Sequence, residues 1–551
     1  MTIQPEFFSK SKKKSSFGKN STSVVSGNDH EYIPIFMSYF HFWGFFIRIN
    51  PHFRLFFQVL GIYLNKIATF ASKPNTRFMM DKNFIGREEE LQILQNIKTS
   101  GEAEFVAVYG RRRVGKTYLI QQFFENDFAF SATGIIDGKK SEEIFAFTSS
   151  LINIGYTGPQ PKDWLEAFEQ LKKTLSQKHC QGRCVIYIDE LPCFDTPKSG
   201  FVRALGYFWN TWASLRKDVI LIVCGSATSW MIDNIVNDHG GLHDRITHAI
   251  YLRQFNLSET EQYLKSRKIT WTRQMIVEAY MMLGGIPYYL SLLDRRESLA
   301  QNIDRLYFRK NAELSQEYHR LYASLFKSPD SYLKIVEVLG KSKQGLTRSE
   351  IASSLKIPSS GTLSKQLENL MLCDIIRQYR TKVNGNTKNN DAYYQLSDFF
   401  SLFHLTFSKK NTTEDYWQQH LNTPVLNTWQ GLSFEHICLA HIRQIRHVLG
   451  LDRIAVEYYS WRSKQAPHAQ VDMIIERADR LINLCEIKYT MVEYLITASE
   501  DMKFRNRIST FIRESKTKFS VIPTWITPYG LSQNEYSANV TYQVTMDDLF
   551  T

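Results

Sequence analysis

The chain has 551 residues, of which 43% are hydrophobic and 14% aromatic, enough apolar material for three or four domains with cores of their own. Its seven cysteines are scattered and include no C-x-x-C pair, which excludes a disulfide framework and a zinc site and predicts thiols in a reducing compartment, the cytoplasm. The formal net charge of +12 would suggest nucleic acid as a partner, but its distribution along the chain weakens that inference.

Residues 1–79 form a basic, aromatic leader. Residues 1–80 hold ten Lys and Arg against three Asp and Glu, so most of the positive charge lies there. Polar residues such as His41, Arg48 and Arg54 interrupt the aromatic run before it reaches the roughly 18 apolar residues that a spanning helix needs. We therefore predict no stable membrane insertion, and attachment to a membrane surface remains the alternative.

Residues 105–117, FVAVYGRRRVGKT, contain a complete phosphate-binding loop of the pattern G-x-x-x-x-G-K-[ST]. An apolar strand precedes it and the helix-periodic run YLIQQFF follows, which is the order such a loop requires. Lys116 is predicted to reach the β- and γ-phosphates, and Thr117 to hold Mg²⁺. The predicted nucleotide-binding residues are Gly110, Arg111, Arg112, Arg113, Val114, Gly115, Lys116, Thr117 and Tyr118.

Residues 184–190, CVIYIDE, read as a buried strand that ends in two carboxylates. With the loop about 70 residues upstream, Asp189 is predicted to hold the hydrated Mg²⁺ and Glu190 to polarise the attacking water. For an isolated segment, two solvated acids at a strand end would be the simpler interpretation. A second apolar strand, residues 219–226, ends in Ser226, which we predict to sense the γ-phosphate, although a serine there is otherwise a turn former.

Helices are predicted for residues 163–178 and 200–216, whose Trp and Phe side chains we expect in the core. The ATPase core is predicted to span residues 80–255, and the helix-rich residues 256–328, interrupted by GGIP at 284–287, to form a lid. The sequence has no guanine-reading N-K-x-D motif where a GTPase needs one, so ATP is preferred over GTP.

Residues 329–408 have the spacing of a winged helix, with three helix-like runs and two strand-like runs around an NGN turn. Thr347 and Ser359 are predicted N-caps, and Glu350 completes a capping box with Thr347. The helix that would read DNA exposes Lys365 near an acidic residue, so its positive potential is weak. A purely structural spacer is therefore an equal alternative for this domain. Phosphate contacts from the wing would come from Arg377, Arg380, Lys382 and Lys388.

Residues 409–551 contain a second group of candidate site residues. Asp472 lies in QVDMIIE, and Glu486 and Lys488 lie in INLCEIKY. Positions i and i+2 share one face of a strand, so Glu486 and Lys488 are predicted to lie together and to face Asp472 across a hairpin. Two such acids could hold a divalent cation, while the lysine steadies a metal-activated water. An alternation of acid and base on a solvated edge strand is the competing interpretation.

Five segments together resemble a known group of proteins: FIGREEEL (84–91), YGRRRVGKT (109–117), YIDE (187–190), CGSATSWM (224–231) and GGIPYYL (284–290). They are similar to bacterial and archaeal P-loop ATPases of the AAA-related, STAND-like branch that carry a C-terminal domain of unknown function. The resemblance implies an extra strand between the loop strand and the IDE strand, and a catalytic glutamate directly after the metal-binding aspartate.

The same resemblance implies further assignments. The Gly-Arg-Glu segment would close over the adenine, and Arg245 would reach a γ-phosphate in cis or across a subunit boundary. A surface ion pair of Arg245 with Asp244 or Asp238 is the alternative. Because the ATPase module of such proteins opens with FIGREEEL, we hypothesise that Met79 or Met80 is the natural start.

The C-terminal pattern resembles the PD-(D/E)-x-K nuclease superfamily, in which Glu435 would correspond to an additional acid beside Asp472 and Glu486. The predicted fold is α/β: a P-loop parallel sheet with a helical lid, a winged helix and a restriction-endonuclease-like domain. The predicted function is ATP hydrolysis that drives or gates the nuclease-like domain. The alternative is a nucleotide-dependent switch or DNA-binding regulator with an inactive C-terminal domain. ATP, Mg²⁺, double-stranded DNA and a second copy of the chain are the ligands and partners considered.

Overall fold

The computed structural model describes residues 84–178, 180, 182–237, 241–242, 244–380, 392–409, 413–463 and 469–551. The chain divides into two units, Met1–Phe84 and Ile85–Thr551, and the elements described here belong to the second. The leader, both candidate start methionines, Asp238, Lys382, Lys388 and the side chain of Arg380 lie outside the described residues. In the described part of the chain, no helix combines the length and apolar character needed to cross a membrane.

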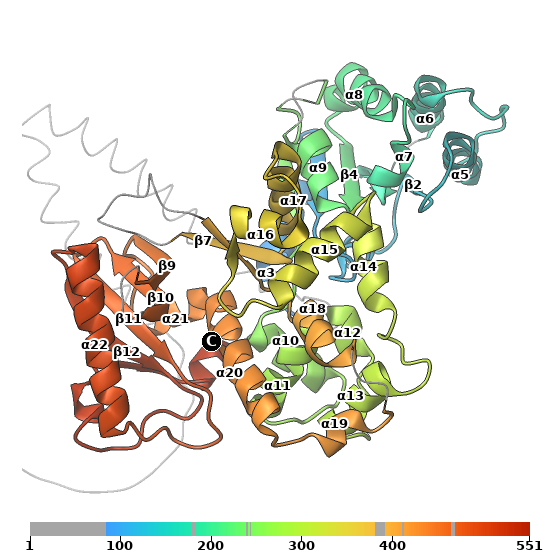
Figure 1. The fold of residues 1–551 in the computed structure, drawn as a ribbon. Helices are drawn as coiled ribbons and strands as arrows, with labels where there is room; N and C mark the ends of the chain where they lie inside the picture. The colour runs from blue at the N-terminus through green and yellow to red at the C-terminus, as the bar shows by residue number, and fades with distance from the viewer. Residues whose placement is uncertain are drawn as a thin grey trace, which may run out of the picture. The chain divides into compact units, whose positions relative to one another are not determined.

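A five-stranded parallel sheet carries the phosphate-binding loop (Figure 1). Its strands are β1 (Glu104–Tyr109), β2 (Phe130–Thr133), β3 (Cys184–Asp189), β4 (Val219–Gly225) and β5 (His248–Tyr251), in the order β2-β3-β4-β1-β5. β4 lies between the loop strand β1 and the IDE strand β3, which confirms the extra strand that the resemblance implied. β3 and β4 are buried along their whole length, as expected for strands with both faces covered.

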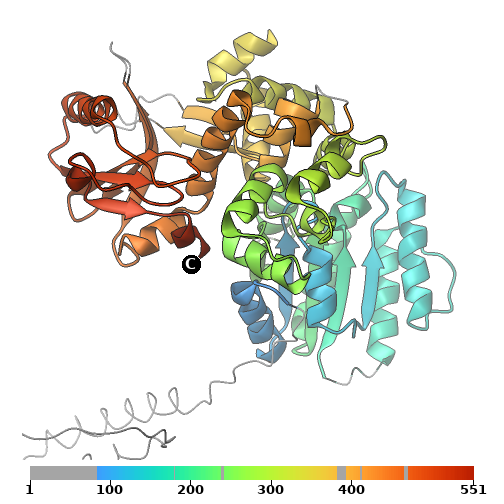
Figure 2. The same ribbon diagram turned by 90° about the horizontal axis from the view of Figure 1, so that it is seen from below.

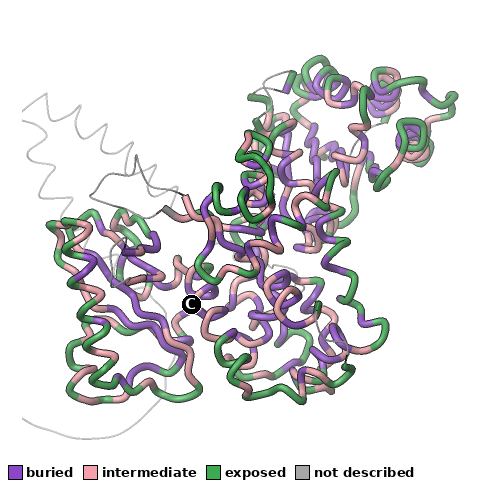
Figure 3. Tube along the Cα trace, in the orientation of Figure 1, coloured by how far each residue is buried: buried purple, intermediate pink, exposed green. Residues whose placement is uncertain are grey.

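Helices pack on this sheet, and buried residues occur in both the helices and the strands (Figure 3). α4 (Lys116–Phe123) follows the loop, and α3 (Glu88–Thr99) precedes β1. α5 (Lys140–Asn153), α6 (Trp164–Gln177) and α8 (Phe201–Thr211) contribute to one core cluster with the strands. The Trp and Phe side chains of the two predicted helices are confirmed as buried: Trp164, Phe168, Phe201, Phe208, Trp209 and Trp212.

A helical segment follows β5, as predicted. It comprises α10 (Leu257–Ser266), α11 (Arg273–Leu283), α12 (Pro287–Ser291), α13 (Leu299–Ile303), the π-helix η4 (Asp304–Phe308) and α14 (Glu317–Leu325). The helix breaks between Leu283 and Pro287, where a Cβ on Gly285 would lie 1.8 Å from the carbonyl oxygen of Phe255. The backbone of the lid therefore approaches the end of the ATPase core too closely for any side chain at that position.

The next segment contains three helices and a small antiparallel sheet. The helices are α15 (Pro329–Gly340), α16 (Arg348–Leu355) and α17 (Gly361–Leu372), and the strands β6 (Leu346–Thr347), β7 (Ile376–Arg380) and β8 (Ala392–Leu396) pair in the order β6-β8-β7. The capping box of Thr347 and Glu350 is confirmed. The prediction of Ser359 as an N-cap was wrong by one residue, because α17 begins at Gly361 and Ser360 takes that position. α18 (Phe399–Phe403) and the π-helix η5 (His404–Ser408) follow.

The C-terminal part is built around a mixed five-stranded sheet in the order β13-β12-β11-β10-β9 (Figure 2). β9 (Val456–Arg462), β10 (Gln470–Arg477) and β11 (Leu481–Ile487) are antiparallel, and β12 (Ser520–Ile526) and β13 (Tyr542–Val544) continue parallel to β11. α22 (Ala498–Ser515) connects β11 to β12 and packs on the sheet through Phe504 and Phe511. The helices α19 (Tyr416–Gln419), α20 (Pro424–Ala440) and α21 (Ile442–Val448) precede the sheet.

Candidate nucleotide site and acidic site

Two glycines shape the phosphate-binding loop between β1 and α4. Gly110 has a φ of 147°, and a Cβ there would lie 2.3 Å from the carbonyl oxygen of Leu252. Gly115, the N-cap of α4, has a φ of 95°. Both positions favour glycine for reasons of backbone geometry. The loop therefore needs its glycine pattern to turn from the strand into the helix N-terminus, where backbone N–H groups would face a bound anion.

Lys116 and Thr117 lie where the loop pattern predicts. The ammonium of Lys116 donates to the carbonyl oxygens of Gly110, at 2.9 Å, and Arg111, at 3.1 Å. The Thr117 hydroxyl donates to Oδ2 of Asp189 at 2.8 Å. The structure therefore brings the loop and the IDE strand together. A hydroxyl and a carboxylate are the oxygen ligands that Mg²⁺ prefers, so the residues present fit that ion.

Glu190 and Ser226 also lie together. Oε2 of Glu190 accepts hydrogen bonds from the Ser226 hydroxyl, at 2.8 Å, and from the Ser226 backbone N–H, at 3.2 Å. Glu190 itself has a φ of 45°, a left-handed conformation that is costly for a residue with a Cβ and that is often found at functional sites. The strand ends of β3 and β4 thus place the predicted base and the predicted γ-phosphate sensor in direct contact.

The three loop arginines reach residues more than 200 positions further along the chain. Arg111 forms a buried ion pair with Asp398, whose other oxygen accepts from Nη2 at 3.3 Å. Although burial opposes its charge, the Asp398 carboxylate raises the pKa of Arg111. Arg113 pairs with Glu317 at 2.9 Å, and Arg112 donates to the carbonyl oxygen of Arg320 at 3.4 Å.

The partners of these arginines belong to α14 and to the N-terminus of α18, so the loop is tied to the lid and to the segment after the small antiparallel sheet. The sequence had left open whether a loop arginine contacts phosphate or a neighbouring domain. Val114 is buried, whereas Tyr118 is 51% exposed. The nucleotide contacts of all these residues remain predictions.

Arg87 supports the loop from the Gly-Arg-Glu segment, a contact that no local pattern predicts. Its guanidinium donates to the carbonyl oxygen of Val114 at 3.1 Å and lies 4.8 Å from the ring centre of Phe255. Its backbone N–H donates to Glu259 at 3.2 Å. Burial lowers the pKa of Arg87, which the nearby Glu259 and Glu90 partly offset. The predicted adenine contact of this segment stays a prediction.

Arg245 is exposed in the turn before β5. Within the described residues, no hydrogen bond or ion pair joins its side chain to Lys116, Glu190 or Ser226. Its approach to a γ-phosphate therefore remains a prediction.

The C-terminal candidates meet on the β10–β11 hairpin. The strands pair antiparallel with Met473, the residue after Asp472, opposite Cys485, the residue before Glu486. The Lys488 ammonium lies 2.9 Å from Oε1 of Glu486. Arg507 of α22, which the sequence analysis did not single out, pairs with the other oxygen of Glu486.

The acids of this hairpin are partly buried and influence one another. Burial, reinforced by the charge of Asp472, raises the pKa of Glu435 on α20 to about 8. Burial also raises the pKa of Asp472, with Glu486 adding to the effect. Among the residues that the structure describes, no three His, Cys, Asp or Glu side chains are grouped closely enough to hold a metal ion. The joint metal role of Glu435, Asp472 and Glu486 stays a prediction.

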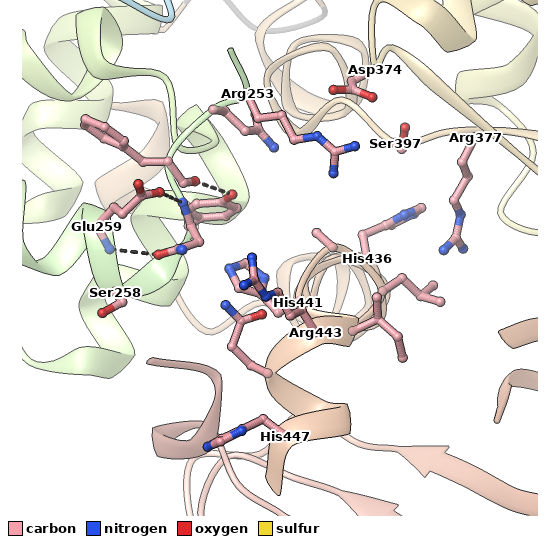
Figure 4. Close-up of a pocket in the computed structure, with 18 of the residues that line it drawn as sticks. Arg253, Ser258, Glu259, Asp374, Arg377, Ser397, His436, His441, Arg443 and His447 are labelled. Atoms are coloured by element: carbon pink, nitrogen blue, oxygen red, sulfur yellow. Dashed lines mark hydrogen bonds between the residues drawn. The ribbon is translucent and has the colours of Figure 1, made fainter. Parts of the chain in front are cut away.

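A cavity of about 1650 Å³ is lined by residues of several segments, among them 86–90, 436–447 and 457–460 (Figure 4). Its wall includes Arg253, Arg377 and Arg443, but also several carboxylates, and Arg443 pairs with Glu89 at 2.9 Å. Nε2 of His441 accepts a hydrogen bond from the backbone N–H of Leu257, and burial lowers the pKa of His441 to about 4. The wall therefore carries mixed charge and does not by itself favour a polyanion.

Comparison with known proteins gives matches to ATPases. Residues 84–293 match a family described as an ATPase domain predominantly from Archaea. An uncharacterized protein of Methanocaldococcus jannaschii is 27% identical over 330 residues, 59% of this chain and 68% of its own length. An uncharacterized ATP-binding protein of the same organism is 49% identical over 43 residues, 8% of this chain and 73% of its own. Among solved structures, the Walker-type ATPase of Pyrococcus abyssi is 19% identical with a TM-score of 0.40, covering 59% of this chain and 97% of its own.

Proposed function

Because residues 84–293 carry an ATPase domain of the predominantly archaeal family, we propose that this protein binds ATP with Mg²⁺ and hydrolyses it. The observation that carries the proposal is the hydrogen bond between Thr117 and Asp189, which joins the phosphate-binding loop to the acidic strand end. A metal-bound triphosphate needs both elements within reach of each other.

Each residue of the site has a definite task in this proposal. Thr117 and Asp189 would hold Mg²⁺, which neutralises charge on the β- and γ-phosphates when bound. Lys116 would exchange its two carbonyl partners for phosphate oxygens. Glu190 would accept a proton from the attacking water, and Ser226 would position Glu190 through the hydrogen bonds already present.

Two substitutions test this proposal. Lys116→Ala is expected to reduce ATP affinity at least 100-fold, because the β- and γ-phosphates lose the ammonium that the loop provides for them. Glu190→Gln is expected to bind ATP nearly normally and to lose hydrolysis by two or more orders of magnitude, because the base acts on the transition state.

Equilibrium dialysis with ATP and phosphate release would measure the two effects separately. Lys217→Ala, which removes an exposed cation that pairs with Glu102 at 3.0 Å just before β4, is the control and should leave hydrolysis within a few-fold of wild type. Normal turnover in Glu190→Gln would place the base elsewhere.

We further propose that the nucleotide state is passed to residues 329–551, where a winged helix would contact double-stranded DNA. The ion pairs of Arg111 with Asp398 and of Arg113 with Glu317 support a direct route from the loop. DNA that stimulates ATP hydrolysis by wild-type protein would support this coupling. Equal rates with and without DNA would remove it.

A nuclease is the second candidate activity, because Glu486 and Lys488 form an ion pair on the hairpin that also carries Asp472. In that case Lys488 would steady a metal-activated water beside the acids. Mg²⁺- or Mn²⁺-dependent cleavage of plasmid DNA should disappear in Glu486→Ala and in Lys488→Ala, and persist in the control Lys503→Ala. Equal residual cleavage in all variants would leave the alternative, a nucleotide-dependent regulator with an inactive C-terminal domain.

A further inference from the structure

A second cavity, of about 530 Å³, lies away from the residues of the nucleotide site and of the acidic site. Its volume falls within the range usual for small-molecule sites. Aromatic rings and cations dominate its wall, which consists of Tyr307, Phe308, Arg309, Lys310, Ser315, Tyr318, His319, His404, Ser408, Lys409 and Glu414.

Two buried polar atoms of this wall have no hydrogen-bond partner among the residues that the structure describes. They are the hydroxyl of Tyr318 and Nδ1 of His404, on side chains that are 1% and 6% exposed. Leaving such a group unsatisfied destabilises the folded protein, so native proteins rarely do so without a functional reason. The two rings stack with centres 4.3 Å apart. Burial, with the nearby His319 and Lys409, lowers the pKa of His404 to about 4, so the imidazole is neutral near pH 7.

The backbone at the cavity is also unusual. η4 ends at Tyr307 and Phe308, and η5 begins at His404, so two π-helical segments contribute to the same wall. Such segments are rare and occur frequently at functional sites, because the widened turn redirects side chains. Their coincidence with the two unsatisfied polar atoms indicates a wall shaped for a ligand.

The charges of the wall favour an anion. Arg309, Lys310 and Lys409 are opposed by one lining carboxylate, Glu414, which accepts from the backbone N–H of Lys310 at 3.4 Å. Lys409 also pairs with Glu337 at 2.7 Å. Cations at the edge and hydrogen-bonding aromatic rings in the buried part match a ligand with a phosphate at one end and a planar ring at the other.

We propose that this cavity binds a small phosphorylated compound with a planar ring, of the nucleoside monophosphate class. The phosphate would lie against Arg309 and Lys310, and the ring would lie against the stacked pair, with the Tyr318 hydroxyl and His404 Nδ1 as hydrogen-bond partners. This site is separate from the loop at Lys116 and does not depend on ATP hydrolysis.

The cavity shares its walls with the elements that hold the phosphate-binding loop. Glu317, the partner of Arg113, directly precedes Tyr318 on α14. Asp398, the partner of Arg111, caps α18, and η5 with His404 continues that helix. A ligand that fixes Tyr318 against His404 would therefore fix both acids that bind the loop arginines, and would change the affinity of the loop for ATP.

Calorimetry on the full-length Lys116→Ala protein tests the site, because this background removes binding at the phosphate loop. The probes are AMP, which has ring and phosphate, adenosine, which has the ring alone, and pyrophosphate, which has no ring. AMP is expected to bind at least 10-fold more tightly than either of the other two. Adding Tyr318→Phe or Arg309→Gln should weaken AMP binding about 10-fold.

Two results would overturn the proposal. Absence of AMP binding at millimolar concentration would mean that the cavity holds ordered water only, and pyrophosphate as tight as AMP would remove the ring from the ligand class. Circular dichroism of each variant guards against unfolding, and Arg309→Gln on the rim keeps the test valid if Tyr318→Phe fails to fold. For the coupling, AMP should change the ATP affinity of otherwise wild-type protein in a way that Tyr318→Phe abolishes, and an identical response in both proteins would refute it.

Discussion

The contact between Glu190 and Ser226 sets the position of the predicted base. Both the hydroxyl and the backbone N–H of Ser226 bond to the same carboxylate oxygen. We expect Ser226→Ala to reduce the rate of ATP hydrolysis about 10- to 100-fold with little change in ATP affinity, because a mispositioned base acts only on the transition state. Single-turnover phosphate release would measure the effect. Ser199→Ala, which removes a buried hydroxyl outside the site, should leave the rate unchanged, and a similar loss there would contradict the assignment.

Glu435 should make stability depend on pH. Burial and the charge of Asp472 raise its pKa from 4.5 to about 8, so the carboxyl binds its proton more tightly in the folded protein than in the unfolded chain. Its contribution to stability is therefore full below about pH 4.5 and is lost as the pH rises towards 8.

Thermal unfolding between pH 5 and pH 8 checks this prediction. In Glu435→Gln, the loss in free energy of unfolding between pH 5 and pH 8 should be smaller than in wild type by roughly 1–3 kcal/mol. This value is lower than the full pKa shift would give, because solvent screens the charges. A Glu435→Gln protein whose pH dependence equals that of wild type would show that another group is responsible.

The site residues that the sequence could reveal are those that follow a local rule. The loop glycines, Lys116, Thr117 and the acids at the end of β3 occur at fixed spacings, and the structure brings them together. The acids Glu317 and Asp398 obey no such rule, because their partners lie more than 200 residues earlier in the chain. Tyr318 and His404 were missed for the same reason, since only the folded chain shows that their polar atoms lack partners.

At the scale of elements, apolar runs and caps predicted most of the parallel sheet. β1, β3 and β4 are strands buried on both faces, so their sequences are continuously apolar. The capping box of Thr347 and Glu350 could be predicted because its two partners lie three residues apart in the sequence. The π-helices η4 and η5 carry no periodic signal that separates them from α-helix, and the sequence did not predict them.

The ion pair between Arg111 and Asp398 links the loop to α18. Replacing Asp398 by Asn keeps a side chain that can accept from Ser401 N–H, at 2.9 Å in the structure, but leaves Arg111 buried without its counter-charge. Because removing one partner of a buried pair costs about 3–5 kcal/mol, we expect a clear drop in the thermal midpoint. Differential scanning calorimetry would detect it.

Arg112→Ala provides the comparison, since its partner is only a backbone carbonyl at 3.4 Å. If Asp398→Asn lowered the midpoint no more than Arg112→Ala, the pair would contribute little to holding α18 against the loop.

At the scale of the whole molecule, α19 and α20 pack against α18 and η5, and α19 also contacts η4. Trp417 and Trp429 contact Phe403 and Phe407, and the backbone N–H of Trp417 donates to Asp304 at 2.7 Å. A fragment that ends at residue 408 would expose this aromatic cluster and leave the buried Asp304 carboxylate without these donors. We expect it to be less stable and more prone to aggregate than the full chain.

Light scattering and thermal unfolding of the fragment would test this expectation. Asp304→Asn in the full chain measures what the charge of Asp304 contributes to stability, because this substitution keeps the aromatic packing. A fragment as stable as the full chain would show that the part of the chain before residue 409 does not need residues 409–551 for its stability.

The hydrogen bonds that Lys116 makes to its own loop should also affect the rate of nucleotide binding. Before its ammonium can turn to a phosphate, the bonds to Gly110 and Arg111 must break, so nucleotide capture includes a rearrangement of the loop. The observed rate constant for ATP association should then reach a plateau as the ATP concentration rises. The plateau value would be set by that rearrangement and not by diffusion.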